Sequence, residues 1–346
     1  MKDKETFFNI DKNKTKFLKG IAILFVLLGH MGYIYKGGSW GVSLLLMLSG
    51  YGIFKSYISN KNKDYFSKKI LKVYIPYLLV TIFILIYSYV KYKIGLKTTV
   101  FSLLGIDFGY ICDKTMWYIS FIFLWYIVFF ISTLLFFKIK KEWLQHLLII
   151  ILCFIFGYLI YRLSRSYMIW GFGSGAFLYV FSFPIGIFMG KLSYIKINKN
   201  IKRFILSVVS FVIILLISLL FNHVDTNFKY FLWVYTMPIL LIIIFDLNII
   251  KTDNKIINYI GDMSYDIYLW EGFLLSIRFK LFDAFSSKIF IDILMIVSCI
   301  FIAKVYRELF IDQLIGFIGK IIEKLKRFKS SHFDSNNVLW YNLRVF

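Results

Sequence analysis

The sequence is poor in charge, in acidic residues and in cysteine, and each shortage excludes a class of protein. Only 17% of its 346 residues are charged and 60% are hydrophobic, which excludes an ordinary soluble domain. Cys112, Cys153 and Cys299 are widely spaced and show neither a disulfide framework nor metal-ligand spacing. A glycine-rich phosphate loop and a G-x-S-x-G nucleophile elbow are also missing from the sequence. The composition predicts a polytopic membrane protein without a metal site.

Long apolar stretches are what the sequence has in abundance. Most of them reach the roughly 20 residues that a membrane-spanning helix needs. We therefore expect an all-α polytopic membrane protein with about ten transmembrane helices. The expected spans are residues 18–36, 40–57, 74–90, 117–137, 145–161, 172–190, 204–221, 228–245, 256–277 and 287–303.

The basic residues are distributed unevenly over the two sides of these spans. With the N-terminus inside, 30 of the 41 Lys and Arg residues fall on inner segments and 11 on outer loops. The positive-inside rule then predicts cytoplasmic N- and C-termini. The net charge of +22 is mostly this topology signal together with attraction to anionic membrane lipids. We expect no nucleic-acid binding, because the basic residues are dispersed and carry no recognition motif.

Two organisational features concern the ends of the chain. The lysine-rich start is not followed by a small-residue cleavage site, so we expect no cleavable signal peptide. Residues 1–310 are expected to form one transmembrane domain, and residues 311–346 a basic cytoplasmic tail. The tail mixes apolar and basic residues at helical spacing, which is typical of a helix on the inner membrane surface. A solvated basic tail is the alternative interpretation.

His30 is the most informative residue, because an ionisable group within a membrane span usually marks a functional site. Lys19 precedes it by eleven residues, which on a helix places both side chains on one face roughly 16 Å apart. Glu271 and His30 each lie about six residues from the outer end of their expected spans, so they could meet at one depth. A carboxylate bonded to one imidazole nitrogen would leave the other nitrogen as a base. For Glu271, the alternative is a carboxylate that reaches the outer interface.

Other elements have both a structural and a functional interpretation. Ser49, Gly50 and Gly52 form a small-residue surface that allows either close helix packing or a cavity wall. Lys69 and Lys72 lie one helical turn apart at an inner loop, where they could hold phosphates or serve topology alone.

Aromatic and hydroxyl side chains could line a cavity. Trp117 and Tyr118 end the longest outer loop, residues 91–116, and could stack on a sugar or belong to an interfacial belt. Ser264 and Tyr265 accompany Asp266, which could face a polar interior.

Five of these elements, in order, resemble the membrane acyltransferase-3 family over roughly residues 15–310. Lys19…His30 resembles its basic-x10-His signature, and LMLSGYGIF (46–54) resembles its F-F-x-x-S-G-Y element. Lys69…Lys72 with Pro76 resembles its R-x-x-R before a proline. W-Y-x-S appears at residues 117–120, and SYDIYLWE (264–271) resembles S-Y-x-x-Y-L-W-H. The chain departs from the pattern in two ways. The basic positions are Lys instead of Arg, and Glu271 stands where many members have His.

The resemblance implies a membrane O-acyltransferase of the bacterial cytoplasmic membrane. It would move an acyl group, most simply acetyl, from cytoplasmic acyl-CoA to a hydroxyl of a surface polysaccharide or lipid-linked glycan. Acetyl-CoA would be a co-substrate, with no permanently bound cofactor. His30 and Glu271 would be catalytic, and Lys19, Lys69 and Lys72 would hold the CoA phosphates. The expected cavity-lining residues are Ser49, Tyr51, Trp117, Tyr118, Ser264, Tyr265 and Tyr268.

Two other functions remain as alternatives. A glycan exporter or flippase would share the spans and a polar cavity but would not need a phosphate-binding mouth. A glycan polymerase usually relies on large, arginine-rich outer loops, and the outer side here is poor in charge.

Overall fold

The computed structural model describes residues 4–59, 64–106, 111–167, 175–221, 227–282, 287–314 and 316–317. Within this part of the chain almost every residue with regular structure is helical. The elements are β1 (Lys4–Thr6), α1 (Lys12–His30), α2 (Gly37–Ser59), α3 (Asp64–Tyr92), α4 (Leu96–Leu104), the 3₁₀ turn η1 (Lys114–Met116), α5 (Trp117–Leu135), α6 (Glu142–Tyr167), the 3₁₀ turn η2 (Ala176–Tyr179), α7 (Ser182–Leu192), β2 (Lys196–Asn198), α8 (Lys199–Phe221), α9 (Asn227–Asp246), α10 (Lys255–Asp262), α11 (Ser264–Phe282), α12 (Lys288–Tyr306) and the π-helical turn η3 (Arg307–Ile311).

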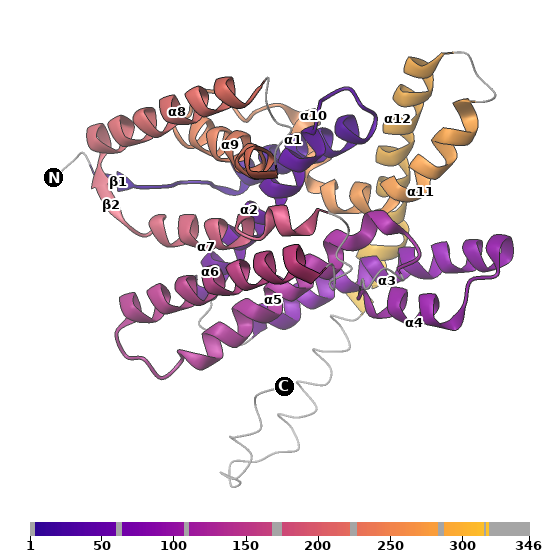
Figure 1. Ribbon diagram of the computed structural model, residues 1–346, viewed down its shortest axis with the longest axis horizontal. Helices are drawn as coiled ribbons and strands as arrows, with labels where there is room; N and C mark the ends of the chain where they lie inside the picture. Colours follow the sequence, from indigo (N-terminus) through magenta and orange to yellow (C-terminus); the bar gives the residue numbers. More distant parts are fainter. Residues whose placement is uncertain are drawn as a thin grey trace, which may run out of the picture.

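The helices form a bundle in which α1 and α2 occupy the interior (Figure 1). Helix α1 packs against α2 and α10, and α2 packs against α7. The hairpin of α11 and α12 lies at one end of the molecule, and α8 and α9 lie toward the other (Figure 1). The outer helices are apolar toward the outside, as expected in lipid, whereas the side chains of α1 and α2 supply much of the core.

Seven helical segments in the described part of the chain are long and apolar enough to cross a membrane. They are Gly37–Ser59, Leu71–Tyr92, Lys114–Leu135, Glu142–Leu163, Lys199–Leu219, Lys229–Asp246 and Lys288–Leu314. The predicted all-α membrane fold is thus confirmed at this level. The stretch Ala176–Leu192 is apolar but shorter. Helix α1 carries several lysines, and α11 carries acidic and basic residues, so neither is uniformly apolar. The count of about ten spans and the cytoplasmic position of both termini stay predictions.

Two expected segments, 256–277 and 91–116, differ in the structure from their prediction. The single span predicted at 256–277 is divided at Met263 into α10 and α11, and α11 continues to Phe282. The break lets α10 lie along the start of α1 while α11 passes the end of α1. The expected outer loop 91–116 contains the helix α4 and the turn η1. Helix α4 begins after Gly95 and ends at Gly105, whose left-handed backbone conformation terminates the helix.

Of the predicted small-residue surface Ser49, Gly50 and Gly52 in α2, Gly50 serves close helix packing. A Cβ on Gly50 would lie 2.2 Å from the Phe183 carbonyl oxygen, and one on Gly186 would lie 2.0 Å from the Met47 carbonyl oxygen. The backbones of α2 and α7 therefore cross at a distance that only glycine permits. A Cβ on Gly52 would meet no atom of the described residues within 4 Å, so the packing interpretation applies to Gly50 and not to Gly52.

The segment before α1 is held by an ion pair. Lys202 and Asp246 are both buried, and their side chains meet at 2.8 Å. Lys202 also donates to the Thr6 carbonyl oxygen at 3.0 Å, and β1 pairs antiparallel with β2. Asp11 then caps α1 by accepting from the Lys14 amide. These contacts fix where α1 starts. Most of the tail predicted at 311–346 lies outside the described residues.

Candidate functional site

His30 and Glu271 are in contact, although they are 241 residues apart in the sequence. His30 is the last residue of α1, and its Nδ1 pairs with the Glu271 Oε1 atom in the middle of α11. The Glu271 side chain is fully buried, whereas the His30 side chain is 42% exposed. An imidazole held through Nδ1 and accessible on its other side leaves Nε2 for an incoming group.

The two residues meet by a different geometry from the one expected. The sequence suggested that the first helix continues to residue 36, with His30 well inside it, but α1 ends at His30. The chain then turns through Gly32, whose φ is +82°, before α2 starts at Gly37. The histidine is thus presented at a helix end, where more of its ring is accessible than in mid-helix. Glu271 does not reach the outer interface, so the alternative interpretation for this residue was wrong.

One carboxylate oxygen of the pair has no protein partner among the described residues. Glu271 Oε2 is buried and receives no hydrogen bond from them. A buried carboxylate oxygen in this state is costly unless a ligand or a water molecule donates to it. The pair therefore leaves two atoms without a partner among the described residues, Nε2 of His30 and the buried Oε2 of Glu271.

A group of cations lies around Lys19, near the middle of α1. Lys19 interacts electrostatically with Lys69 and Lys72, so the three lysines predicted to act together lie near one another. Lys69 is half-buried and its ammonium lies 5.9 Å from the centre of the Tyr126 ring, whereas Lys72 is exposed. Burial lowers the pKa of Lys69 from its usual value, and the charge of Lys72 lowers it further. Such a site favours an anionic ligand, because the ligand offsets the repulsion among the cations.

Arg307 also belongs to this group and was missed from the sequence. It opens the π-helical turn η3 and interacts electrostatically with Lys19. Its guanidinium donates to the Asp262 carbonyl oxygen and lies 3.5 Å from the Asp266 carboxylate. The available signal was an arginine directly after the last apolar stretch, but topology alone accounts for such a residue. Only the packing of α12 beside α10 and α11 makes it part of the site.

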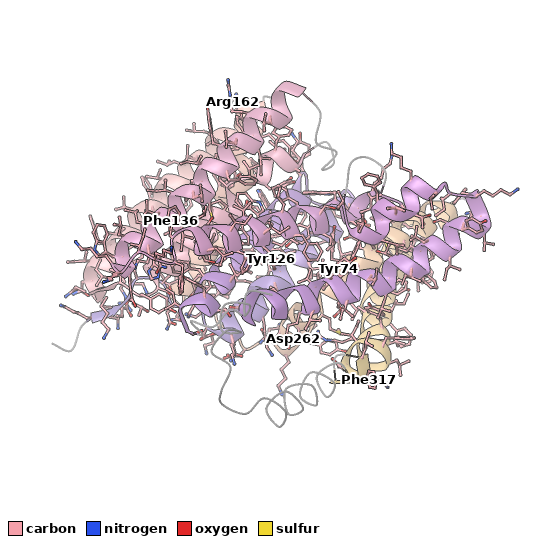
Figure 2. The ribbon with its side chains drawn as sticks, turned by 90° about the horizontal axis from the view of Figure 1, so that it is seen from below. Tyr74, Tyr126, Phe136, Arg162, Asp262 and Phe317 are labelled. Carbon is pink, nitrogen blue, oxygen red and sulfur yellow. The ribbon has the colours of Figure 1, made fainter. Side chains whose placement is uncertain are left out.

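Tyrosines fill the space between the cations and the His30–Glu271 pair. Tyr126 lies near the middle of the bundle (Figure 2) and shares a 2.7 Å hydrogen bond with Ser49. Tyr265 donates to the Val73 carbonyl oxygen at 2.6 Å, beside Lys72 in α3. One turn further along α11, Tyr268 donates to the Thr115 carbonyl oxygen. Each of these hydroxyls is thus held by a hydrogen bond to a neighbouring element of the bundle.

The remaining predicted cavity residues take different positions. Tyr118 is buried and its ring packs on Tyr268 with centroids 5.3 Å apart, so it does not belong to an interfacial belt. Trp117 stacks on Tyr179 with centroids 5.6 Å apart. Ser264 is buried at the first position of α11.

Tyr51 lies apart from this set. Its hydroxyl accepts from the Ile10 amide at 3.3 Å and from Lys55 at 3.4 Å. Two residues along a helix differ by about 200° in direction, so Tyr51 and Ser49 point to different sides of α2. The structure therefore does not bring Tyr51 to the tyrosines near Tyr126.

Within the described residues, no three His, Cys, Asp or Glu side chains gather in a way that could hold a metal ion. The chemistry available to these residues is acid–base chemistry at His30, with a group of cations around Lys19, eleven residues earlier on the same helix. These features define an integral membrane enzyme of the group-transfer class.

Comparison with protein families identifies the family. A family model described as an acyltransferase domain, acyltransferase-3, matches residues 13–306, and the chain belongs to this family. The protein is therefore a membrane acyltransferase, as the sequence motifs predicted. Searches among curated proteins and among solved structures each gave no significant match.

Proposed function

We propose that this membrane acyltransferase moves an acyl group, acetyl in the simplest case, from cytoplasmic acyl-CoA to a hydroxyl of a surface glycan. The acceptor would be a capsular, exopolysaccharide or cell-wall glycan or its lipid-linked precursor, and the enzyme would work in a bacterial cytoplasmic membrane. One observation carries the proposal. The accessible imidazole of His30 is held by a buried carboxylate at one end of α1, and cations gather around Lys19, eleven residues earlier on the same helix.

The cationic group is the proposed site for the CoA phosphates. Lys19, Lys69 and Lys72 would act as point charges, and Arg307 would add a planar guanidinium that can bind a phosphate through two hydrogen bonds. Every basic position of the family motifs is a lysine in this chain, and an ammonium cannot form two parallel hydrogen bonds to one phosphate. Arg307 would supply this bidentate contact. Its contact with Asp262 holds the guanidinium in place.

The distance along α1 suits an extended thioester. Lys19 and His30 are eleven residues apart in one helix, which is roughly 16 Å at 1.5 Å per residue. A CoA molecule with its phosphates at Lys19 would extend its pantetheine arm past Tyr126 and Tyr265 toward His30. Further residues along the proposed path of the pantetheine arm would be Ser49, Tyr268, Tyr118, Trp117 and Ser264.

The chemical step follows from the hydrogen bond between His30 and Glu271. Nδ1–H donates to the carboxylate, which leaves Nε2 unprotonated and able to take the proton of the acceptor hydroxyl. The hydroxyl oxygen attacks the thioester carbonyl, the carbon–sulfur bond breaks, and His30 returns the proton to the CoA thiolate. The products are the ester and free CoA. Glu271 stabilises the imidazolium while it carries the proton.

The first test compares surface glycans from cells that carry the intact chain, a His30→Ala variant, or neither. Proton NMR should show an O-acyl signal only with the intact chain, because a positioned acid–base group contributes about 10²–10⁴-fold to the rate. The signal would also identify the acyl group and the esterified position. His30→Asn serves as a matched variant, since its amide can still donate to Glu271 but cannot act as a base.

Two results would contradict this function. Equal ester content in all three strains, with less surface glycan when the chain is absent, would indicate an exporter. A folded His30→Asn protein that keeps more than about a tenth of the activity would remove His30 from the chemistry.

A further inference from the structure

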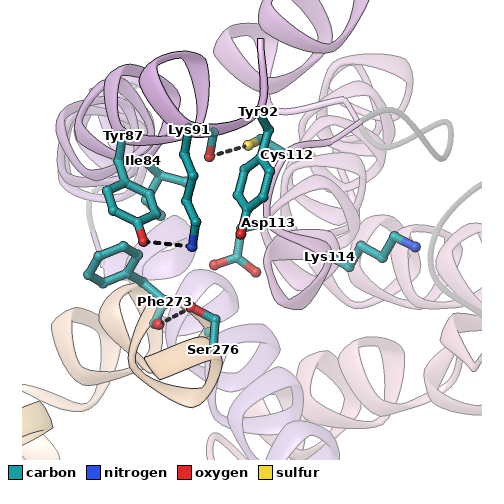
Figure 3. A pocket seen from close by; sticks show the side chains of 11 residues that line it. Ile84, Tyr87, Lys91, Tyr92, Cys112, Asp113, Lys114, Phe273 and Ser276 are labelled. Carbon is teal, nitrogen blue, oxygen red and sulfur yellow. Dashed lines mark hydrogen bonds between the residues drawn. The ribbon is translucent and has the colours of Figure 1, made fainter. Parts of the chain in front are cut away.

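A second site lies on the predicted outer side, between the end of α3, the turn η1 and α11 (Figure 3). It is a pocket of about 280 Å³. Small-molecule sites usually measure about 300–1,000 Å³, so the pocket suits a single ring and not an oligosaccharide. Its lining combines aromatic, hydroxyl and charged side chains, among them Tyr87, Lys91, Tyr92, Asp113 and Ser276.

Asp113 presents one of its two carboxylate oxygens without a partner. Its Oδ1 accepts from the Thr115 amide at 2.9 Å and from the Thr115 hydroxyl at 2.7 Å. No hydrogen bond from the described residues reaches its Oδ2. Burial raises the pKa of this carboxyl above its usual value, and the bonds from Thr115 only partly oppose that effect. A hydroxyl that donates to Oδ2 would supply the partner that the described residues do not.

The opposite wall supplies a donor and aromatic surface. The Lys91 ammonium lies 3.3 Å from the Tyr87 hydroxyl, and Figure 3 shows it pointing into the same pocket as the Asp113 carboxylate. Lys114 points away from the pocket (Figure 3). An acceptor, a donor and aromatic rings around a ring-sized space are the groups that bind a polyhydroxylated ring.

The pocket borders the His30–Glu271 pair through a single residue. Gly272 follows Glu271 in α11, and a Cβ at Gly272 would lie 2.5 Å from Asp113 Oδ2 and 2.1 Å from the Thr115 hydroxyl. Asp113 can therefore lie directly against α11 only because residue 272 has no side chain. This places the pocket beside the helical turn that carries Glu271.

We propose that this pocket binds one neutral sugar ring of the acceptor, with Asp113 Oδ2 accepting a hydrogen bond from a ring hydroxyl and Lys91 donating to another. The proposal rests on the proposed acyl transfer to a glycan. It favours a neutral ring over a lipid phosphate, because a phosphate would meet the Asp113 carboxylate at short range. The ring would be oriented so that a different hydroxyl, on it or on its neighbour, faces His30.

The test uses the purified full chain in nanodiscs and three probes, the methyl glycosides of glucose, galactose and N-acetylglucosamine. With at least one probe, Asp113→Asn should raise the KM for the sugar about tenfold or more, as expected for a lost hydrogen bond to a charged acceptor. The KM for acetyl-CoA should change less than about twofold. Asp253→Asn, at an exposed carboxylate elsewhere, is the matched control and should leave both KM values unchanged.

A Gly272→Ala variant tests the same site from the other side. Its methyl group would displace the Asp113 carboxylate, so it should reproduce the rise in the sugar KM in a protein that still purifies as a folded monodisperse species. Direct binding separates this proposal from the proposed function. Saturation-transfer NMR should detect one of the methyl glycosides on the intact chain and lose the signal with Asp113→Asn, whether or not any ester forms.

Several outcomes would overturn the assignment. Equal saturation-transfer signals from the intact chain and Asp113→Asn would place the sugar elsewhere, and no signal from any of the three probes would exclude a neutral-sugar pocket. Competition by nanodiscs rich in anionic lipid, with no effect of the sugars, would indicate a lipid headgroup site. Failure of acyl transfer with retained Asp113-dependent sugar binding would contradict the proposed function and leave the pocket assignment standing.

Discussion

Replacing Glu271 by Gln removes the negative charge beside His30 and keeps the size of the side chain. The amide oxygen of Gln can still accept from Nδ1–H, so the tautomer and the ring orientation are preserved. What is lost is the stabilisation of the imidazolium that forms when His30 takes the proton from the acceptor. The variant therefore isolates the electrostatic contribution of the carboxylate from its positioning role.

The magnitude follows from the burial of the two groups. Opposite unit charges about 4 Å apart attract each other by about 4 kcal/mol at an effective dielectric constant of about 20. The His30 side chain is 42% exposed, so solvent screening reduces this value, and we expect about 2–3 kcal/mol. At about 1.4 kcal/mol for each factor of ten, Glu271→Gln should lower kcat by about 30–150-fold.

The assay is release of free CoA from acetyl-CoA in the presence of acceptor, measured on purified protein in nanodiscs. The KM for acetyl-CoA should stay within about twofold, because the loss occurs when the imidazolium forms and not when the donor binds. The melting temperature should be equal or higher, since Glu271 is fully buried and an ionised buried carboxylate is costly. Glu142→Gln, at the exposed start of α6, is the control for the loss of one carboxylate.

A kcat within about threefold of the wild-type value would refute the reasoning, because the carboxylate would then not stabilise charge at His30 in the rate-limiting step. A rise in KM with an unchanged kcat would instead indicate that Glu271 acts by holding the substrate.

Three further predictions concern other parts of the molecule. Arg307→Lys should raise the KM for acetyl-CoA about tenfold and weaken discrimination against acetyl-dephospho-CoA, because an ammonium lacks the bidentate fork. Equal KM values for both donors before and after the change would exclude a contact with the 3′-phosphate. Gly186→Val should prevent folding, since a Cβ there would lie 2.0 Å from the Met47 carbonyl oxygen, and a monodisperse, active variant in size-exclusion chromatography would contradict the packing. Burial and then the charge of Lys72 lower the pKa of Lys69. A bound phosphate would raise this pKa again, because the negative charge stabilises the protonated ammonium. Acetyl-CoA binding should therefore take up protons and weaken as the pH rises from about 7 to about 10, and titration calorimetry in buffers of different ionisation enthalpy should show less uptake in Lys69→Gln.

Parts of the site could be predicted because they depend on one helix or on one motif. Lys19 and His30 share a helix, and helical periodicity alone gives their spacing and face. The pairing of His30 with Glu271 was predicted from similar depth, although the helix end at His30 and the break at Met263 were not. These boundaries depend on α10 packing against α1, which no local pattern records.

Other residues could not be assigned without the fold. Arg307 resembles any basic residue at an inner loop, and it joins the cations only because α12 ends beside α10 and α11. Asp113 resembles a loop carboxylate until Gly272 is seen to make room for it. Tyr51 belongs to the same motif as Ser49, yet the rotation of the helix sends it to the N-terminal segment.

The sequence by itself determined the membrane class, the helical content and the family motifs, because hydrophobic length and spacing along one chain are local properties that a bilayer makes nearly obligatory. The tertiary structure decided which distant side chains meet. It joined His30 to Glu271, added Arg307 to the lysines and set Asp113 against Gly272. Contacts of this kind arise from how helices cross and where they end, and helix crossing is a property of pairs of segments that no single segment encodes.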